Sequence, residues 1–233
     1  MNLKVGALGI VVCVVAMGTN DTVRAAAAGA DEVKLVGAAT IVLNEMMRAG
    51  DKAIPGAILE QAEAIAIFPG VKKAGLVIGK QWGHGIVSVR DRDARTWSSP
   101  TFLAITGGSL GAQIGGTETD LILVVMNRSG VEHLLSNNQV TLGADLSATA
   151  GPVSSAHEAS TDLQTHAAIF SYSRSRGLFA GVAVNGSVIK QDAEANARFY
   201  EQALSPEEIV LGRAEHAPAS VAVLQTSLTR HGK

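Results

Sequence analysis

Cysteine is almost absent from this chain: its 233 residues include one, Cys13. Because Cys13 lies in an apolar run near the start, the rest of the chain can form neither a disulfide nor a catalytic thiolate. Aromatic residues account for 4% of the sequence and charged residues for 17%, against 47% hydrophobic residues. This composition excludes a disordered chain, and a net charge of −2 excludes a global basic field for nucleic acid.

The first 25 residues are typical of an export signal. Their apolar run, residues 5–17, is shorter than the about 20 residues that a transmembrane helix requires. Small residues follow, so we expect cleavage after Ala25, or after Ala27 as the second choice, and a mature protein in the periplasm or cell envelope. Val12 stands before Cys13 where a lipoprotein signal has a small residue, which argues against lipid anchoring through Cys13.

Beyond the signal, the hydrophobic pattern predicts helices at both ends of one domain. Apolar residues spaced three and four apart over 33–47 predict an amphipathic helix, and Pro55 opens a second short helix. Helical signals return at Ala193 and at Ser205, which begins a capping box. We therefore predict a single domain over residues 26–212, followed by a weakly patterned tail over residues 213–233, in which residues 221–228 allow a frayed helix.

The central part of the chain predicts β-structure. Short apolar or alternating runs begin at Ile65 and are separated by turns, of which Asn185-Gly186 is the strongest hairpin signal. Pro69-Gly70 is expected to end the first strand, and the glycine-broken segment 81–85 to interrupt the next. The predicted fold class is α+β: a strongly bent, mainly antiparallel, glycine-rich sheet or partly closed barrel, covered by the terminal helices.

A glycine-rich stretch, residues 97–127, lies at the centre of the chain and allows two interpretations. Glycine tolerates tight bends and close backbone approach, so the stretch either holds a ligand or catalytic serine, or curves the sheet. Ser109 lies in a G-x-S-x-G pattern, but residues 112–116 lack the helix that a nucleophile elbow requires. Curvature is the favoured interpretation and a serine hydrolase the weaker alternative. The structural glycines are Gly107, Gly108, Gly111, Gly115 and Gly116; partners for Ser109 would come from Asp145 or Asp162 and His157 or His166.

The sequence predicts no cofactor and no metal site. Its six histidines show no paired spacing with carboxylates of the kind that binds zinc. Gly70 and Gly75 have the spacing of a phosphate-binding loop, but Leu76 stands where that loop has its lysine.

One local charge feature points to a ligand. Residues 71–95 include six basic and two acidic residues, which gives a local charge of +4. A basic patch with an aromatic residue suits an anionic phospholipid surface, where each basic residue contributes about 1 kcal/mol. A hairpin whose charges only face water is the alternative. The candidate lipid-binding residues are Lys72, Lys73, Lys80, Trp82, Arg90, Arg92 and Arg95.

Over residues 54–200 the chain resembles the SYLF-domain family. The resemblance implies a non-enzymatic module that binds membranes, with phosphoinositides as ligands of eukaryotic members, some of which also bind actin. The motifs that carry it are AIAIFP at 64–69, KAG at 73–75, WSSP at 97–100, GAQIG at 111–115, TDL at 119–121, LGAD at 142–145, AGP at 150–152, YSRSRGLFAG at 172–181, and Asn196 before Tyr200.

Two departures from the family pattern change the expected partner. Trp82 and His84 replace the small or polar residues expected in the glycine-rich hairpin, and the chain carries an export signal. Because an exported protein meets neither actin nor, usually, phosphoinositides, the expected partner is an anionic phospholipid membrane. A structural or protein-interaction module that binds envelope proteins is the alternative.

Overall fold

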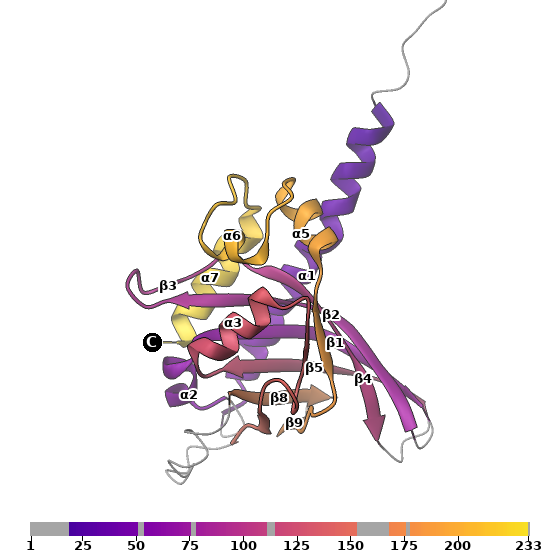
Figure 1. Ribbon diagram of the computed structural model, residues 1–233, viewed down its shortest axis with the longest axis vertical. Helices are drawn as coiled ribbons and strands as arrows, with labels where there is room; N and C mark the ends of the chain where they lie inside the picture. Colours follow the sequence, from indigo (N-terminus) through magenta and orange to yellow (C-terminus); the bar gives the residue numbers. More distant parts are fainter. Residues whose placement is uncertain are drawn as a thin grey trace, which may run out of the picture.

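The computed structural model describes residues 19–50, 54–75, 78–110, 115–152, 168–175 and 178–232 (Figure 1). Its helices are α1 (Thr19–Met47), α2 (Gly56–Gln61), α3 (Arg128–Ser136), α5 (Ala193–Tyr200), α6 (Pro206–Val210) and α7 (Ala219–His231). Its strands are β1 (Ala64–Gly75), β2 (Ile78–Asp91), β3 (Thr96–Trp97), β4 (Thr101–Leu110), β5 (Gly115–Val125), β6 (Gln139–Thr141), β7 (Ala148–Ala150), β8 (Ile169–Ser175), β9 (Leu178–Gly181) and β10 (Val188–Gln191).

One curled sheet forms the centre of the molecule. Its strand order is β6-β10-β4-β2-β1-β5-β8-β7, with β3 paired to β2 and β9 to β8. Among the described strands, every ladder is antiparallel except the one between β7 and β8. The predicted fold class, α+β with a strongly bent and mainly antiparallel sheet, is confirmed (Figure 1).

Both faces of the sheet are buried over its wide part. Side chains alternate along β1, so Ile65 and Ile67 pack beneath α1, α2, α5 and α7, while Ala66 and Phe68 face the opposite side. On that side α3 contributes Val131 to a second buried cluster. The helices therefore lie on both sides of the sheet.

The expected helix starts are present in the structure. Ser205 and Glu208 form the capping box of α6, with Pro206 at its first turn. Pro55 is the N-cap of α2, as its position before a short apolar face predicts. The Ser205 side chain satisfies a backbone N–H group that has no partner inside α6, whereas Pro55 makes no side-chain capping hydrogen bond.

Two strands run through segments expected to break them. β1 continues past Pro69-Gly70 because its ladders shift register there, which is a β-bulge. Gly70 has a φ of +60°, and its N–H donates to the Asp120 carboxylate at 2.9 Å. β2 likewise runs unbroken through residues 81–85, where a Cβ at Gly85 would overlap the Ile67 carbonyl and the Phe68 ring. These glycines allow strands to pass close together rather than end.

Asn185-Gly186 is a turn but not a hairpin between neighbouring strands. Gly186 has a φ of +81°, as a turn glycine should. However, β9 pairs with β8, whereas β10 crosses to lie between β4 and β6. The hairpin prediction is therefore wrong, because the turn reverses the chain between two different regions of the sheet.

The segment after Gly212 was expected to be a tail and forms a core helix. α7 packs on α1 with Val221, Leu224 and Leu228 buried. The predicted signal core and Cys13 lie outside the described residues, and α1 begins at Thr19. Within the described ranges, no helix has the length and apolar character to cross a membrane.

Candidate functional site

The β1–β2 tongue, defined here as residues 71–75 and 78–84, carries four of the seven candidate residues. Lys72 on β1 lies directly opposite Trp82 on β2, so the two side chains share one face of the sheet. Alternation places Lys80 on this face, the face that α1 covers elsewhere, and Lys73 on the opposite face. Lys72 and Lys80 are exposed, and Trp82 is 44% exposed although it is a large apolar side chain.

The charge of the tongue is positive but small. Lys72 also pairs across the sheet with Glu118 of β5, the acidic residue nearest to it in the ladder. Three lysines against this glutamate leave a local charge of 3 − 1 = +2. The sequence has no ionisable residue between Lys73 and Lys80, so these lysines border an uncharged stretch.

Arg90 is half-buried and bound to three backbone carbonyl groups. Its guanidinium donates to the carbonyl oxygens of Ala62 at 2.9 Å, Leu59 at 2.7 Å and Gly232 at 3.1 Å. It also stacks over Trp97, 4.4 Å from the ring centroid. Burial, followed by repulsion from Arg92, lowers the pKa of Arg90. These hydrogen bonds connect α2, the end of α7 and the sheet. Arg90 therefore has a structural role.

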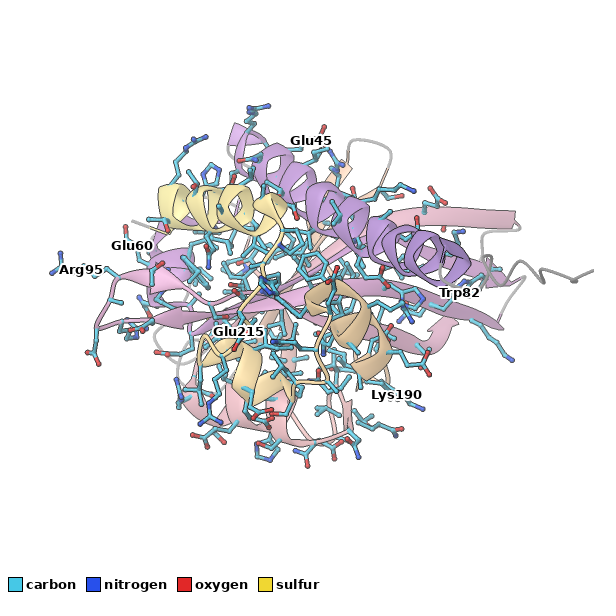
Figure 2. The ribbon with its side chains drawn as sticks, turned by 90° about the horizontal axis from the view of Figure 1, so that it is seen from above. Glu45, Glu60, Trp82, Arg95, Lys190 and Glu215 are labelled. Carbon is cyan, nitrogen blue, oxygen red and sulfur yellow. The ribbon has the colours of Figure 1, made fainter. Side chains whose placement is uncertain are left out.

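Arg92 and Arg95 lie near Arg90 and far from the tongue. Arg92 donates to the Glu63 carboxylate at 2.7 Å and to the Gln61 carbonyl. Arg95 is an exposed turn residue with a φ of +52°. Lys80 and Arg90 stand ten residues apart on β2, about 33 Å at the rise of a strand. Figure 2 shows Trp82 and Arg95 at opposite ends of the sheet, so the structure divides the predicted patch in two.

Ser109 has the wrong backbone setting for a nucleophile elbow. It lies in β4, paired with Gly79 of β2, and the next described element is the strand β5. An elbow requires a sharp turn from a strand into a helix. The proposed partners His157, Asp162 and His166 lie outside the described residues, as does Gly111.

The predicted structural glycines do not all meet the same constraint. A Cβ at Gly107 would lie 3.1 Å from the Ser187 Cα, whereas a Cβ at Gly108 would meet nothing within 4 Å. Gly115 and Gly116 lie in β5, paired with Gly75 and Ala74. Close packing therefore explains glycine at position 107, and the structure gives no steric reason for it at position 108.

A partly buried ion network joins the bulge, the sheet and α1, and sequence reasoning missed it. Besides binding the Gly70 N–H, Asp120 accepts from Arg174 Nε at 2.9 Å and Nη2 at 2.6 Å. Arg174 also pairs with Glu45 on α1. Burial alone would lower the pKa of Arg174, but hydrogen bonds to Asp120 and Glu45 outweigh it and raise that pKa. The only sequence signal was that Asp120 and Arg174 lie in family motifs.

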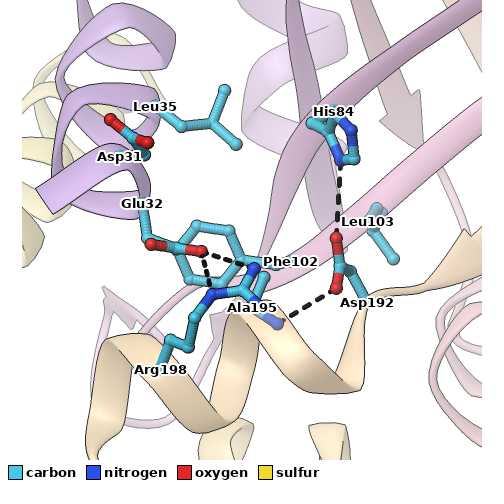
Figure 3. Close-up of a pocket in the computed structure, with 9 residues that line it drawn as sticks. All are labelled: Asp31, Glu32, Leu35, His84, Phe102, Leu103, Asp192, Ala195 and Arg198. Atoms are coloured by element: carbon cyan, nitrogen blue, oxygen red, sulfur yellow. Dashed lines mark hydrogen bonds and ion pairs between the residues drawn. The ribbon is translucent and has the colours of Figure 1, made fainter. Parts of the chain in front are cut away.

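A cavity of about 480 Å³ lies between α1, α5 and the strands β2 and β4 (Figure 3). Asp192 is the N-cap of α5: one carboxylate oxygen accepts from the Ala195 N–H, and the other lies 3.4 Å from His84 Nδ1. On the opposite wall, Glu32 of α1 accepts from Arg198 of α5 at 2.7 Å. These four polar residues come from segments far apart in sequence, which is why the sequence did not reveal the cavity.

A family described as Ysc84, Las17-binding protein actin regulator, matches residues 106–231, which is more than half of the chain. The chain belongs to the Ysc84 family. This is the SYLF-domain family that the sequence motifs predicted, and the prediction is confirmed. The matched region of the Ysc84 family includes α7, the helix that the sequence left as a tail.

Among the relatives, protein YSC84 of Saccharomyces cerevisiae is 34% identical over 189 residues, 78% of this chain and 40% of that protein. LAS seventeen-binding protein 3 of the same species is also 34% identical, over 78% of this chain and 39% of that protein. The human SH3 domain-containing YSC84-like protein 1 is 36% identical over 70% of this chain and 47% of that protein. The chain thus spans less than half the length of these relatives.

Proposed function

We propose that this Ysc84-family chain is a non-enzymatic module that binds anionic phospholipid surfaces in the cell envelope through its β1–β2 tongue. The observation that carries the proposal is one uncovered sheet face on which Lys72, Lys80 and the half-exposed Trp82 lie together. The family resemblance and the export signal in the sequence support the ligand class and the location.

Charge and exposure favour the tongue over the arginine end of the sheet. Lys72, Lys73 and Lys80 have no ion pair among the described residues, whereas Arg92 is paired with Glu63 and Arg90 is caged by carbonyls. Unpaired lysines can approach lipid phosphates without breaking a protein contact. At about 1 kcal/mol for each basic residue near an anionic surface, Lys72 and Lys80, which share the uncovered face, supply a weak, salt-sensitive attraction of about 2 kcal/mol.

Trp82 is placed to anchor the tongue at the membrane interface. A tryptophan ring has a large apolar body and one N–H donor, and it favours the boundary between hydrocarbon and lipid headgroups. In water, by contrast, the exposed part of the ring contributes no free energy of apolar burial to the folded protein. The lysines would thus bring the tongue to the membrane and the indole would hold it there.

Vesicle co-sedimentation tests the proposal. The mature protein should sediment with vesicles that contain phosphatidylglycerol and remain in solution with pure phosphatidylcholine. The double variant Lys72→Glu/Lys80→Glu should lower the affinity about 30-fold or more, because at least 2 kcal/mol of attraction is lost. Trp82→Ala should weaken binding at all salt concentrations, since its contribution is not electrostatic.

The matched control is Arg95→Glu, which reverses a charge that is equally exposed but lies at the other end of the sheet. It should bind vesicles like the wild type. Equal sedimentation with neutral and anionic vesicles would refute the electrostatic proposal, and an equal loss in Arg95→Glu would refute the assignment to the tongue.

The second candidate is a protein-interaction module of the envelope. It is favoured by the description of the family, Las17-binding protein actin regulator, and by the name of one relative, LAS seventeen-binding protein 3. A single stoichiometric partner in a pull-down from envelope extracts, together with no vesicle binding, would support this function over the first. Either function is non-enzymatic, and a fluorophosphonate probe that labelled Ser109 would contradict both.

A further inference from the structure

The strand β4 has an open edge where it enters the tongue. Its ladder with β10 ends at Thr106, whereas its ladder with β2 continues to Leu110. The chain before β10 leaves the sheet on the face that carries Gln81, whose Nε2 donates to Ser187 Oγ at 2.7 Å. Residues 107–110 therefore have β2 on one side and, among the described strands, no neighbour on the other.

The backbone of β4 directs polar groups to this open edge. Phe102 donates its N–H to the Asn196 side chain and accepts from the Asp192 N–H, so its own polar groups point away from β2. In an antiparallel ladder these groups alternate from side to side with a period of two residues, and β4 pairs with β2 without a register shift. Gly108 and Leu110 therefore present their N–H and C=O groups, four in all, at the open edge.

The described part of β4 lacks the features that usually protect a sheet edge. Such edges are blocked by charged side chains, by proline, by a bulge or by a covering segment. Residues 101–117 include no charged residue and no proline, and the ladder between β2 and β4 has no bulge. A Cβ at Gly108 would meet nothing within 4 Å, so no described segment lies over the strand there. The edge is therefore free to pair with another strand.

We propose that two copies of this chain pair through the β4 edge. The two strands run antiparallel about a two-fold axis at Ser109, and Gly108 of each copy exchanges two hydrogen bonds with Leu110 of the other. This register uses the four polar groups that each edge presents, and it requires only residues 108–110. The result is one continuous sheet that runs through both copies.

Charge makes β4 suitable for pairing with its own copy. Residues near a two-fold axis face the same residues of the other copy, so a charged strand would place like charges opposite each other, and β4 has no charge. Lys80 lies opposite Gly108 one strand inward, so the two Lys80 residues are at least three strand spacings, about 14 Å, apart. The open stretch of β5 suits this pairing less well, because it contains Glu118, whose carbonyl already accepts from the Ser175 hydroxyl.

Pairing doubles the proposed membrane surface, a consequence that rests on the proposed function. The two-fold axis is perpendicular to the sheet, so Lys72, Lys80 and Trp82 of both copies face the same side. Two linked surfaces bind a membrane more tightly than one, because the second contact is intramolecular. The paired edge is short, so the dimer is weak in solution and is favoured where vesicles concentrate the protein.

Disulfide trapping tests the pairing, because the chain has no cysteine after Cys13. Residues that oppose each other at a non-hydrogen-bonded site have Cα atoms about 4.5 Å apart, which a disulfide can span. With copper phenanthroline as the oxidant, the mature Ser109→Cys protein should form a covalent dimer at least about tenfold faster than Thr106→Cys. Thr106 is the matched control, an exposed residue of the same strand whose two copies lie six residues out of register, about 20 Å apart.

Gly108→Pro, introduced together with Ser109→Cys, tests the hydrogen bonds of the edge. Proline removes the N–H that points to the open edge, so the ladder between β2 and β4 keeps its hydrogen bonds. Trapping should be lost, whereas Gly108→Ala, which keeps the N–H, should be trapped as fast as Ser109→Cys alone. Circular dichroism of each variant verifies the fold.

Equal trapping of Ser109→Cys and Thr106→Cys, no dimer from either, or unchanged trapping in a folded Gly108→Pro variant would overturn the proposal. A disulfide to another protein of an envelope extract, with no homodimer, would assign the edge to a foreign strand instead. The trapped dimer should bind phosphatidylglycerol vesicles at least about tenfold more tightly than the reduced protein. A trapped dimer that binds no vesicles would refute the lipid role of the tongue and leave the pairing intact.

Discussion

Replacement of Arg90 by lysine separates a structural role from an electrostatic one. The variant keeps the positive charge that an anionic membrane would attract. It removes the planar fork, however, that reaches three carbonyl oxygens on α2 and at the end of α7. If Arg90 mattered as a surface charge, Arg90→Lys would be harmless; if it holds the fold together, the variant should be destabilised.

The expected loss follows from the contacts. A lysine ammonium can reach one of the three carbonyls, so two charge-assisted hydrogen bonds are lost, at about 1.5 kcal/mol each. Loss of the stacked contact with Trp97, 4.4 Å from the ring centroid, adds about 0.5–1 kcal/mol. The total, about 3–4 kcal/mol, corresponds to a fall in Tm of about 10 °C for a domain of this size.

Urea unfolding followed by circular dichroism measures this loss. The control is Arg92→Lys, because Arg92 is 53% exposed and its pair with Glu63 is worth about 1 kcal/mol at most. Arg90→Lys should unfold at a clearly lower urea concentration than Arg92→Lys, with both bound equally well by anionic vesicles. Coincident unfolding midpoints would refute the structural role of Arg90.

Three further predictions concern the glycines, the ion network and pH. Gly85→Ala should cost about 3 kcal/mol or more in thermal unfolding, because its Cβ overlaps β1, whereas Gly108→Ala should be neutral because its Cβ meets nothing within 4 Å. Asp120→Asn should cost about 2 kcal/mol in urea unfolding, since the amide has one acceptor oxygen and cannot accept from both Arg174 and the Gly70 N–H; a urea midpoint equal to wild type would contradict this. Burial, then Arg230 and Arg48, lowers the pKa of His231, which lies 2.9 Å from Asn44 between α7 and α1. The unfolded chain therefore binds the proton more readily, and stability should fall as the pH drops below about 6.5. His231→Gln should reduce that fall, and identical pH profiles would exclude His231 as its source.

Local patterns in the sequence predicted most of the fold. The capping box at Ser205 and the start of the short helix at Pro55 are encoded within a few residues, and each appears where expected. The failures at Pro69-Gly70 and residues 81–85 share one cause. Proline and glycine there indicated strand ends, but the contact that explains them is between strands, where β1 bulges and β2 passes close to it.

The sequence predicted only part of the candidate site, because neighbouring residues in the sequence can lie far apart in the structure. Residues 71–95 form one basic segment in sequence, but a long strand separates its two ends in space. Lys72 and Lys80 share one face because β1 and β2 pair antiparallel with Lys72 opposite Trp82, while Arg90 lies at the far end of β2 and donates to backbone carbonyls. The cavity is beyond sequence reasoning, since Glu32, His84 and Asp192 meet only after α1 and α5 pack on the sheet.

The lysines of the tongue and the carboxylates of the cavity between α1 and α5 have opposite charge, and their separation decides whether they interfere. Lys80 and His84 lie four residues apart on β2, about 13 Å at the rise of a strand. At about 0.15 M salt the screening length is about 8 Å, so the acidic cavity weakens the attraction of the tongue only slightly. At about 0.01 M salt the screening length grows to about 30 Å, and the cavity then opposes the lysines.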